Sequence, residues 1–139
     1  MKIISSNIIL ISLLWIGLVS CGKNANDKSV DQDTVSVITL ISPEDLNSAN
    51  DNILLIDVRT PNEYASGHIQ NSVNIDYRAE NFKELIQELD KNQDVYVYCK
   101  VGGRSGSAAK MMEKMGFKKV YDLDGGISNW EKKDLKTVK

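Results

Sequence analysis

The sequence predicts an α/β fold with a mainly parallel central sheet flanked by helices on both faces. From residue 35 onward, short apolar runs alternate with helix-start signals, which is the order that a parallel sheet with crossover helices requires. One run, residues 53–58, is continuously apolar until Asp57, as expected of a central strand covered on both sides. With 139 residues, 42% of them hydrophobic, the chain has the size of one modest domain.

The first half of this domain is expected to contain three strands and two helices. Strands are predicted at residues 35–40, 53–58 and 72–75, where β-branched and aliphatic residues gather. Helices are predicted to start at Ser42 and Thr60, because each hydroxyl N-cap is followed by a proline and, three residues on, by an acidic residue.

The second half is expected to contain two strands and three helices. In two of its segments, apolar residues recur at i, i+3, i+4 and i+7, which places them on one face of a helix. Gly116 is placed to end the second of these helices in a left-handed conformation. Strands are expected at residues 94–99 and 120–121, and helices at 82–89, 108–115 and 127–130.

The first twenty residues have the composition of an export signal. The apolar run from Ile8 to Val19 has twelve residues, whereas a transmembrane helix needs about 20 and a secretory signal about 7–15. Residues 18–21, LVSC, resemble the bacterial lipobox, in which cleavage before the cysteine leaves it lipid-modified. The resemblance implies that residues 1–20 are removed and that lipidated Cys21 anchors an exported protein to a bacterial membrane, in the periplasm or at the cell surface. An ordinary signal peptide, with Cys21 incidental, is the alternative.

Two polar segments are expected to flank the domain. Residues 21–34 are predicted to be the lipidated N-terminus and a solvated tether, because they lack a periodic apolar pattern. Residues 132–139 are predicted to be a solvated, lysine-rich tail. The folded domain then covers residues 35–131.

Charge and composition exclude several classes of function. The 17 basic and 19 acidic residues give a net charge of −2, and the basic residues are spread along the chain, so nucleic acid is not an expected partner. One histidine and two cysteines cannot provide the four ligands of a structural zinc site. Neither a metal nor another cofactor is expected.

Cys99 is the candidate nucleophile of the chain. It ends a predicted strand, and open α/β sheets bind their ligands beyond the carboxyl ends of the strands. The glycine-bearing loop after it leads into a helix, so backbone amides and the helix N-terminus form an anion-binding nest around the sulfur. We expect the pKa of this thiol to lie below the free value of about 8.5. The alternative is a buried structural thiol.

Three blocks of the sequence resemble rhodanese-like sulfurtransferases. Residues 97–105, VYCKVGGRS, look like the C-x-x-G-x-R-S active-site loop of that family, and residues 57–75 and 115–130 look like its earlier and later blocks. The resemblance covers residues 35–131 and implies the rhodanese fold. It also implies that Cys99 takes a sulfane sulfur from a donor such as thiosulfate or polysulfide, holds it as a persulfide, and passes it to cyanide, a thiol or a protein acceptor.

The loop after Cys99 is expected to bind the substrate. A dianionic donor requires cations, so Arg104 is expected to bind the donor oxyanion through its planar guanidinium, with Lys100 as a point charge. Backbone amides of the loop are expected to stabilise both the thiolate and the persulfide, without a histidine base. The substrate-binding residues predicted in this way are Lys100, Val101, Gly102, Gly103, Arg104 and Ser105.

Two other functions suit a loop that contains a cysteine and an arginine. Related phosphatases and arsenate reductases bind a phosphate-sized anion there, typically with more residues between the cysteine and the arginine than the four found here. The shorter loop favours a sulfur atom on Cys99 over a phosphate ester. The second alternative is a non-catalytic binding or sulfur-carrier module, although inactive family members usually lack the cysteine.

Four further polar or aromatic residues are expected to be structural. His68 invites comparison with a Cys–His protease, but the resemblance implies a structural role for it. Asp57 and Glu63 are predicted to accept hydrogen bonds from the backbone and to pair with Arg59 or cap the second helix. Trp130 is predicted to pack against the sheet near the loop.

Overall fold

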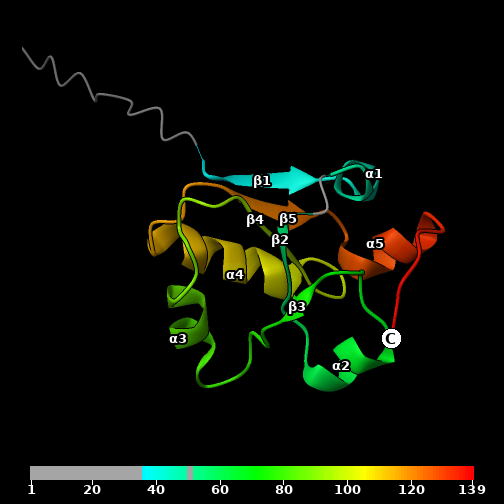
Figure 1. Ribbon diagram of the computed structural model, residues 1–139, viewed down its shortest axis with the longest axis horizontal. Coiled ribbons are helices and arrows are strands. Elements are labelled where there is room, and N and C mark those ends of the chain that lie inside the picture. The colour runs from blue at the N-terminus through cyan, green and yellow to red at the C-terminus, as the bar shows by residue number, and fades with distance from the viewer. Residues whose placement is uncertain (1–35, 50–51) are drawn as a thin grey trace, which may run out of the picture. The chain divides into compact units, whose positions relative to one another are not determined.

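A parallel sheet forms the centre of the domain (Figure 1). The structure, a computed structural model, describes residues 36–49 and 52–139. Within these residues five strands pair in parallel, in the order β1-β5-β4-β2-β3. Their bounds are β1 Ile38–Ile41, β2 Leu54–Asp57, β3 Val73–Asn74, β4 Val95–Tyr98 and β5 Val120–Leu123.

Helices cover both faces of this sheet, as the sequence predicts. Their bounds are α1 Pro43–Asn47, α2 Pro61–Ser66, α3 Phe82–Gln87, α4 Gly103–Lys114 and α5 Gly126–Lys132. Apolar residues of α3 and α4 pack in the cluster on one face, and those of α1 and α5 pack in the cluster on the other. Because all strands run the same way, their carboxyl ends lie at one edge of the sheet.

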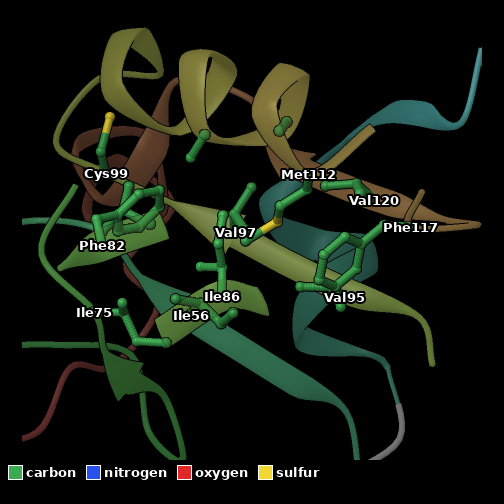
Figure 2. Close-up of a cluster of buried hydrophobic side chains, with 13 residues drawn as sticks. Ile56, Ile75, Phe82, Ile86, Val95, Val97, Cys99, Met112, Phe117 and Val120 are labelled. Atoms are coloured by element: carbon green, nitrogen blue, oxygen red, sulfur yellow. The ribbon is translucent and has the colours of Figure 1, made fainter. Parts of the chain in front are cut away.

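The larger of the two clusters lies between the sheet and α4 (Figure 2). Val97 on β4 and Met112 on α4 are fully buried there, and Cys99 stands at the end of the same cluster. Burial of one such aliphatic side chain stabilises the fold by about 1.5–3 kcal/mol. The cysteine is therefore attached to the buried core of the domain.

Both predicted helix starts are confirmed. The Ser42 hydroxyl accepts a hydrogen bond from Asp45 N over 3.1 Å. Thr60 and Glu63 form a complete capping box, in which each side chain bonds the backbone of the other. These local contacts satisfy amides that a helix start otherwise leaves unpaired.

Several element bounds differ from those predicted. Helix α4 begins at Gly103 rather than at residue 108, because the loop after Cys99 turns directly into it. It ends before Gly116, whose φ of +91° is the left-handed conformation that was expected there. Strand β5 extends to Leu123, two residues beyond the predicted end.

The C-terminal segment is held by the domain. His68 N donates to Val138 O and Val138 N donates to His68 O, each over 2.9 Å. The Trp130 indole donates to Lys136 O over 3.0 Å, and Leu135 packs against the smaller cluster. The sequence predicts a solvated tail over residues 132–139. The lysine side chains there are exposed, but the backbone of Val138 and the carbonyl of Lys136 are bound by the domain.

The predicted export signal, Cys21 and the tether, residues 1–34, lie outside the described residues. Among the described residues, no helix has the length and apolar character needed to cross a bilayer.

Candidate active site

Cys99 directly follows β4, at the carboxyl edge of the sheet and near the start of α4 (Figure 2). Its sulfur accepts a hydrogen bond from Gly102 N over 3.1 Å and one from the Ser105 hydroxyl over 3.6 Å. Gly102 has a φ of +103°, a left-handed conformation that side chains disfavour. A Cβ at this position would meet nothing within 4 Å, so conformation rather than space requires the glycine. The turn directs the amide of Gly102 at the sulfur.

The pKa of the Cys99 thiol is lowered from its ordinary value. Burial has the largest single influence and raises this pKa. Hydrogen bonds from the Ser105 hydroxyl and from the amides of Ser105, Val101 and Gly102 lower it and together prevail. This direction agrees with the sequence-based expectation. A lowered pKa raises the fraction of thiolate at neutral pH, and the thiolate is the reactive form of cysteine.

The start of α5 supports the loop from behind. Ile127 N donates to Cys99 O over 2.9 Å, and Ser128 N donates to Lys100 O over 3.0 Å. A Cβ at Gly126 would lie only 2.5 Å from Cys99 O, and Gly126 has a φ of +59°. Only glycine fits where these two backbone segments meet. The carbonyls of Cys99 and Lys100 are bound on this side, and the amide of Gly102 faces the sulfur.

Arg104 pairs with Glu63, a contact that the sequence did not indicate. The two terminal nitrogens of Arg104 each donate to one carboxylate oxygen of Glu63, over 2.7 Å. The hydrogen bond from Arg104 is the largest cause that lowers the pKa of Glu63, to about 2. An anionic donor that binds Arg104 must use the three N–H groups that Glu63 leaves free or displace Glu63.

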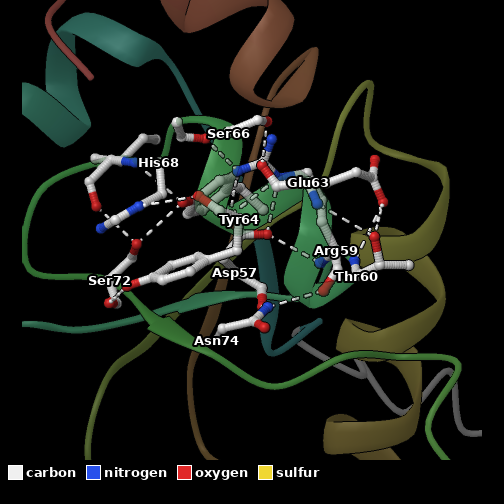
Figure 3. Close-up of polar contacts among 12 residues, drawn as sticks. Asp57, Arg59, Thr60, Glu63, Tyr64, Ser66, His68, Ser72 and Asn74 are labelled. Atoms are coloured by element: carbon white, nitrogen blue, oxygen red, sulfur yellow. Dashed lines mark hydrogen bonds and ion pairs between the residues drawn. The ribbon is translucent and has the colours of Figure 1, made fainter. Parts of the chain in front are cut away.

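A buried ion pair lies beside α2 (Figure 3). Arg59 donates to both carboxylate oxygens of Asp57, with a shortest distance of 2.6 Å, and to Gly67 O over 2.7 Å. The Asn74 amide bonds the carbonyls of Asp57 and Arg59. Asp57 therefore has the predicted partner. Glu63 caps α2 as expected and pairs with Arg104 instead of Arg59.

His68 contacts α2 and the C-terminal segment. Its ring stacks on Tyr64 with centroids 3.8 Å apart, and its Nδ1 lies 3.1 Å from Tyr64 O. Its backbone pairs with Val138. These contacts favour the structural role that was expected for His68.

The remaining loop residues differ in exposure. Lys100 and Gly103 are exposed, Val101 is 67% exposed, and Ser105 is fully buried. Trp130 is buried in the smaller cluster, against the sheet as predicted. The loop therefore presents two charges and one apolar side chain around a sulfur that is almost fully covered.

Comparison with known proteins assigns the family. The model of the rhodanese-like domain matches residues 42–133. The chain belongs to the rhodanese-like family. Its fold agrees with a rhodanese-related protein from Thermoplasma volcanium, with a TM-score of 0.64 and 30% identity, over 70% of this chain and 95% of that one.

Several relatives have names that refer to sulfur, and two of them illustrate the range. A thiosulfate sulfurtransferase GlpE from Pseudomonas syringae is 38% identical over 77 residues, which are 55% of this chain and 71% of that protein. A putative sulfur carrier protein YrkF from Bacillus subtilis is 30% identical over 108 residues, which are 78% of this chain. The match spans 57% of that carrier protein.

Proposed function

We propose that the chain is a sulfurtransferase that carries sulfane sulfur as a persulfide on Cys99. The single observation that carries this proposal is the environment of the Cys99 sulfur, which accepts hydrogen bonds from Gly102 N and the Ser105 hydroxyl at the start of α4. Donors that point at a sulfur stabilise the thiolate, and they are equally suited to the anionic outer sulfur of a persulfide.

The proposed transfer has two steps, and in each the bond that forms replaces one that breaks. The Cys99 thiolate attacks the outer sulfur of thiosulfate, a new S–S bond forms, and sulfite leaves with the electron pair of the broken bond. Cyanide or a thiolate then attacks the outer sulfur of the persulfide, and the electron pair of the S–S bond returns to Cys99. The donor enters with negative charge, which the exposed Lys100 and the guanidinium of Arg104 offset.

Phosphate ester hydrolysis is the less favoured alternative. The four residues between Cys99 and Arg104 form a small ring, and Gly102 N lies 3.1 Å from the sulfur. A tetrahedral phosphate would need donors farther from the sulfur than this. A non-catalytic sulfur carrier differs only in the second step, because it would form the persulfide and release it to a partner protein.

The test is intact-mass measurement after incubation with thiosulfate, followed by addition of cyanide. We expect one additional sulfur atom on Cys99 in the first stage, then its loss with equal formation of thiocyanate. Cys99→Ser should show neither event while keeping the fold. Absence of the additional sulfur with thiosulfate, polysulfide and a glutathione persulfide alike would overturn the proposal, and so would turnover of a chromogenic phosphate ester instead.

We also propose that Cys21 is lipidated and holds the domain at a bacterial membrane, outside the cytoplasm. The support is the apolar run Ile8 to Val19 followed by the lipobox-like residues 18–21. The test is incorporation of labelled palmitate by cells that express the full chain. Label in the full chain and none in Cys21→Ala supports the anchor, whereas equal label in both or in neither contradicts it.

A further inference from the structure

Asp122, on β5, is a buried carboxyl that the proposed reaction does not use. Asp122 is only 5% exposed, and its Oδ1 has no hydrogen-bond partner in the part of the chain that the structure describes. An unpaired buried acceptor of this kind loses its hydrogen bonds to water without replacement, so such groups are rare in folded proteins. The position of the carboxyl therefore calls for a physical reason.

The carboxyl lies behind the candidate active site. Asp122 is aligned with Val97, two residues before Cys99 on the neighbouring strand. A Cβ at Gly106 would lie 3.4 Å from Asp122 Oδ2, so the carboxyl abuts the first turn of α4. Ser105 stands in the same turn, fully buried.

The Ser105 hydroxyl has one proton and several acceptors. It lies 3.6 Å from Cys99 Sγ and 3.2 Å from Gly102 O. Its hydrogen bonds in the structure go to these two acceptors, and it lies near enough to Asp122 to lower the pKa of that carboxyl, against the larger, opposing influence of burial. A hydroxyl can donate only one strong hydrogen bond at a time. Turning this hydroxyl toward Asp122 would therefore remove its bond to Cys99.

The surroundings of Asp122 favour its neutral form. Burial raises its pKa most, and the nearby charge of Asp124 raises it further. In the sheet it is flanked by the apolar Leu40 of β1 and Val97 of β4, and α4 faces it with Ser105 and Gly106. The titratable groups to consider are thus Asp124 and, through Ser105, Cys99.

We propose that Asp122 is a positioning residue that sets the direction of the Ser105 hydroxyl and thereby the nucleophilicity of Cys99, a role that rests on the proposed sulfur transfer. A protonated Asp122 donates to Ser105, whose own proton then points to the sulfur. An ionised Asp122 attracts the Ser105 proton and adds a second negative charge. Both effects raise the pKa of Cys99, and the proton exchanged in this change goes to or comes from solvent.

The test is the rate at which iodoacetamide alkylates Cys99 as a function of pH. The full chain is used, and peptide mass spectrometry counts Cys99 separately from Cys21. Asp122→Asn keeps the shape of the carboxyl without its charge. Above the pH at which Asp122 ionises, we expect Cys99 in this variant to react at least about threefold faster than in the wild type. The plot of alkylation rate against pH should then show one titration step, where the wild type shows two.

Two further variants make the outcome decisive. Asp124→Asn, an exposed carboxylate two residues on, should leave the two-step profile in place. In a Ser105→Ala background, Asp122→Asn should have little effect, because the hydroxyl that transmits the change is gone. Identical profiles of wild type and Asp122→Asn would overturn the proposal. An equal change with and without Ser105 would also overturn it, by indicating a simple effect of charge.

Alkylation requires no sulfur donor, so the result separates the two proposals. A persulfide that forms normally beside an unchanged alkylation profile overturns only the role of Asp122. A Ser105-dependent shift in the alkylation profile, in a chain that accepts no sulfur from any donor, supports the role of Asp122 and overturns the sulfur transfer.

Discussion

Arg104 and Glu63 form a two-pronged ion pair that joins the start of α4 to the first turn of α2. Each terminal nitrogen of Arg104 lies 2.7 Å from one carboxylate oxygen of Glu63, and Glu63 also bonds the Thr60 backbone. The loop around Cys99 is therefore fixed from the side of α2 as well as from α5. The pair also keeps the guanidinium at the loop, where an anionic donor would meet it.

Glu63→Gln should destabilise the protein at neutral pH and much less in acid. The pKa of Glu63 is lowered to about 2, mainly by the hydrogen bond from Arg104, so the folded state binds the proton less readily than the unfolded state. This stabilisation is complete above the ordinary pKa of 4.5 and is lost as pH falls toward 2. The carboxylate is 34% exposed, so solvent screening limits the effect to about 1 kcal/mol.

The free energy of unfolding of wild type and Glu63→Gln is measured with urea at neutral pH and again at a pH well below 4.5. Glu84→Gln, which changes an exposed glutamate on α3, is the matched control and should alter neither value. A loss of stability in Glu63→Gln that does not depend on pH would contradict the role of its charge.

Changes at Arg104 and Glu63 should shift the KM for thiosulfate in opposite directions. Arg104→Ala removes the cation and should raise KM about tenfold or more, whereas Arg104→Lys should restore part of the affinity as a point charge. Glu63→Gln leaves Arg104 without its competing carboxylate and should lower KM. Steady-state thiocyanate formation measures all three. An unchanged KM in Arg104→Ala would remove Arg104 from donor binding.

Gly126→Ala should destabilise the fold and displace the active-site loop. Its Cβ would lie 2.5 Å from Cys99 O, at a φ of +59°, so either the loop or α5 must move. We expect a loss of about 2–4 kcal/mol from overpacking and backbone strain together. Gly116→Ala is the matched control, because its φ is also positive but a Cβ there meets nothing within 4 Å. Equal losses in both variants, read from urea midpoints, would show that strain alone matters.

Tyr98→Phe should cost about 1–3 kcal/mol, because it leaves a buried amide without its partner. The Tyr98 hydroxyl accepts from Ile69 N over 3.1 Å and bonds the Ser72 hydroxyl over 3.0 Å, with the ring fully buried. Burial raises the pKa of this phenol, so it stays neutral. Tyr121→Phe, in a half-buried ring, is the comparison. Thermal unfolding that is equal for both variants would contradict the expectation.

Features with local causes were predictable from the sequence, and features set by packing were not. The caps at Ser42 and Thr60 involve residues three apart, and the left-handed Gly116 follows directly from the end of an apolar stripe. The Glu63–Arg104 pair joins residues 41 apart, and sequence offered Arg59 as an equally reasonable partner for Glu63. Only the placement of α2 beside the loop decides between the two.

The burial of Asp122 was hidden for a similar reason. In sequence it directly follows the short strand predicted at residues 120–121, where an acidic residue is ordinarily solvated. The first turn of α4 covers it, and that depends on where the loop after Cys99 ends. The pattern of the loop after Cys99 thus predicted the position of the sulfur, whereas the polar residues behind it are brought there only by the packing of α4 on β5.

The pairing of Val138 with His68 has a practical consequence for anyone who handles this protein. Trypsin cleavage after Lys132 or Lys133 would remove the strand-like partner of His68 together with the carbonyl that receives the Trp130 indole. A trimmed preparation would then differ from the intact one in the packing of α5, whose first residues support Cys99. Mass verification of the last seven residues should precede any comparison of specific activities between preparations.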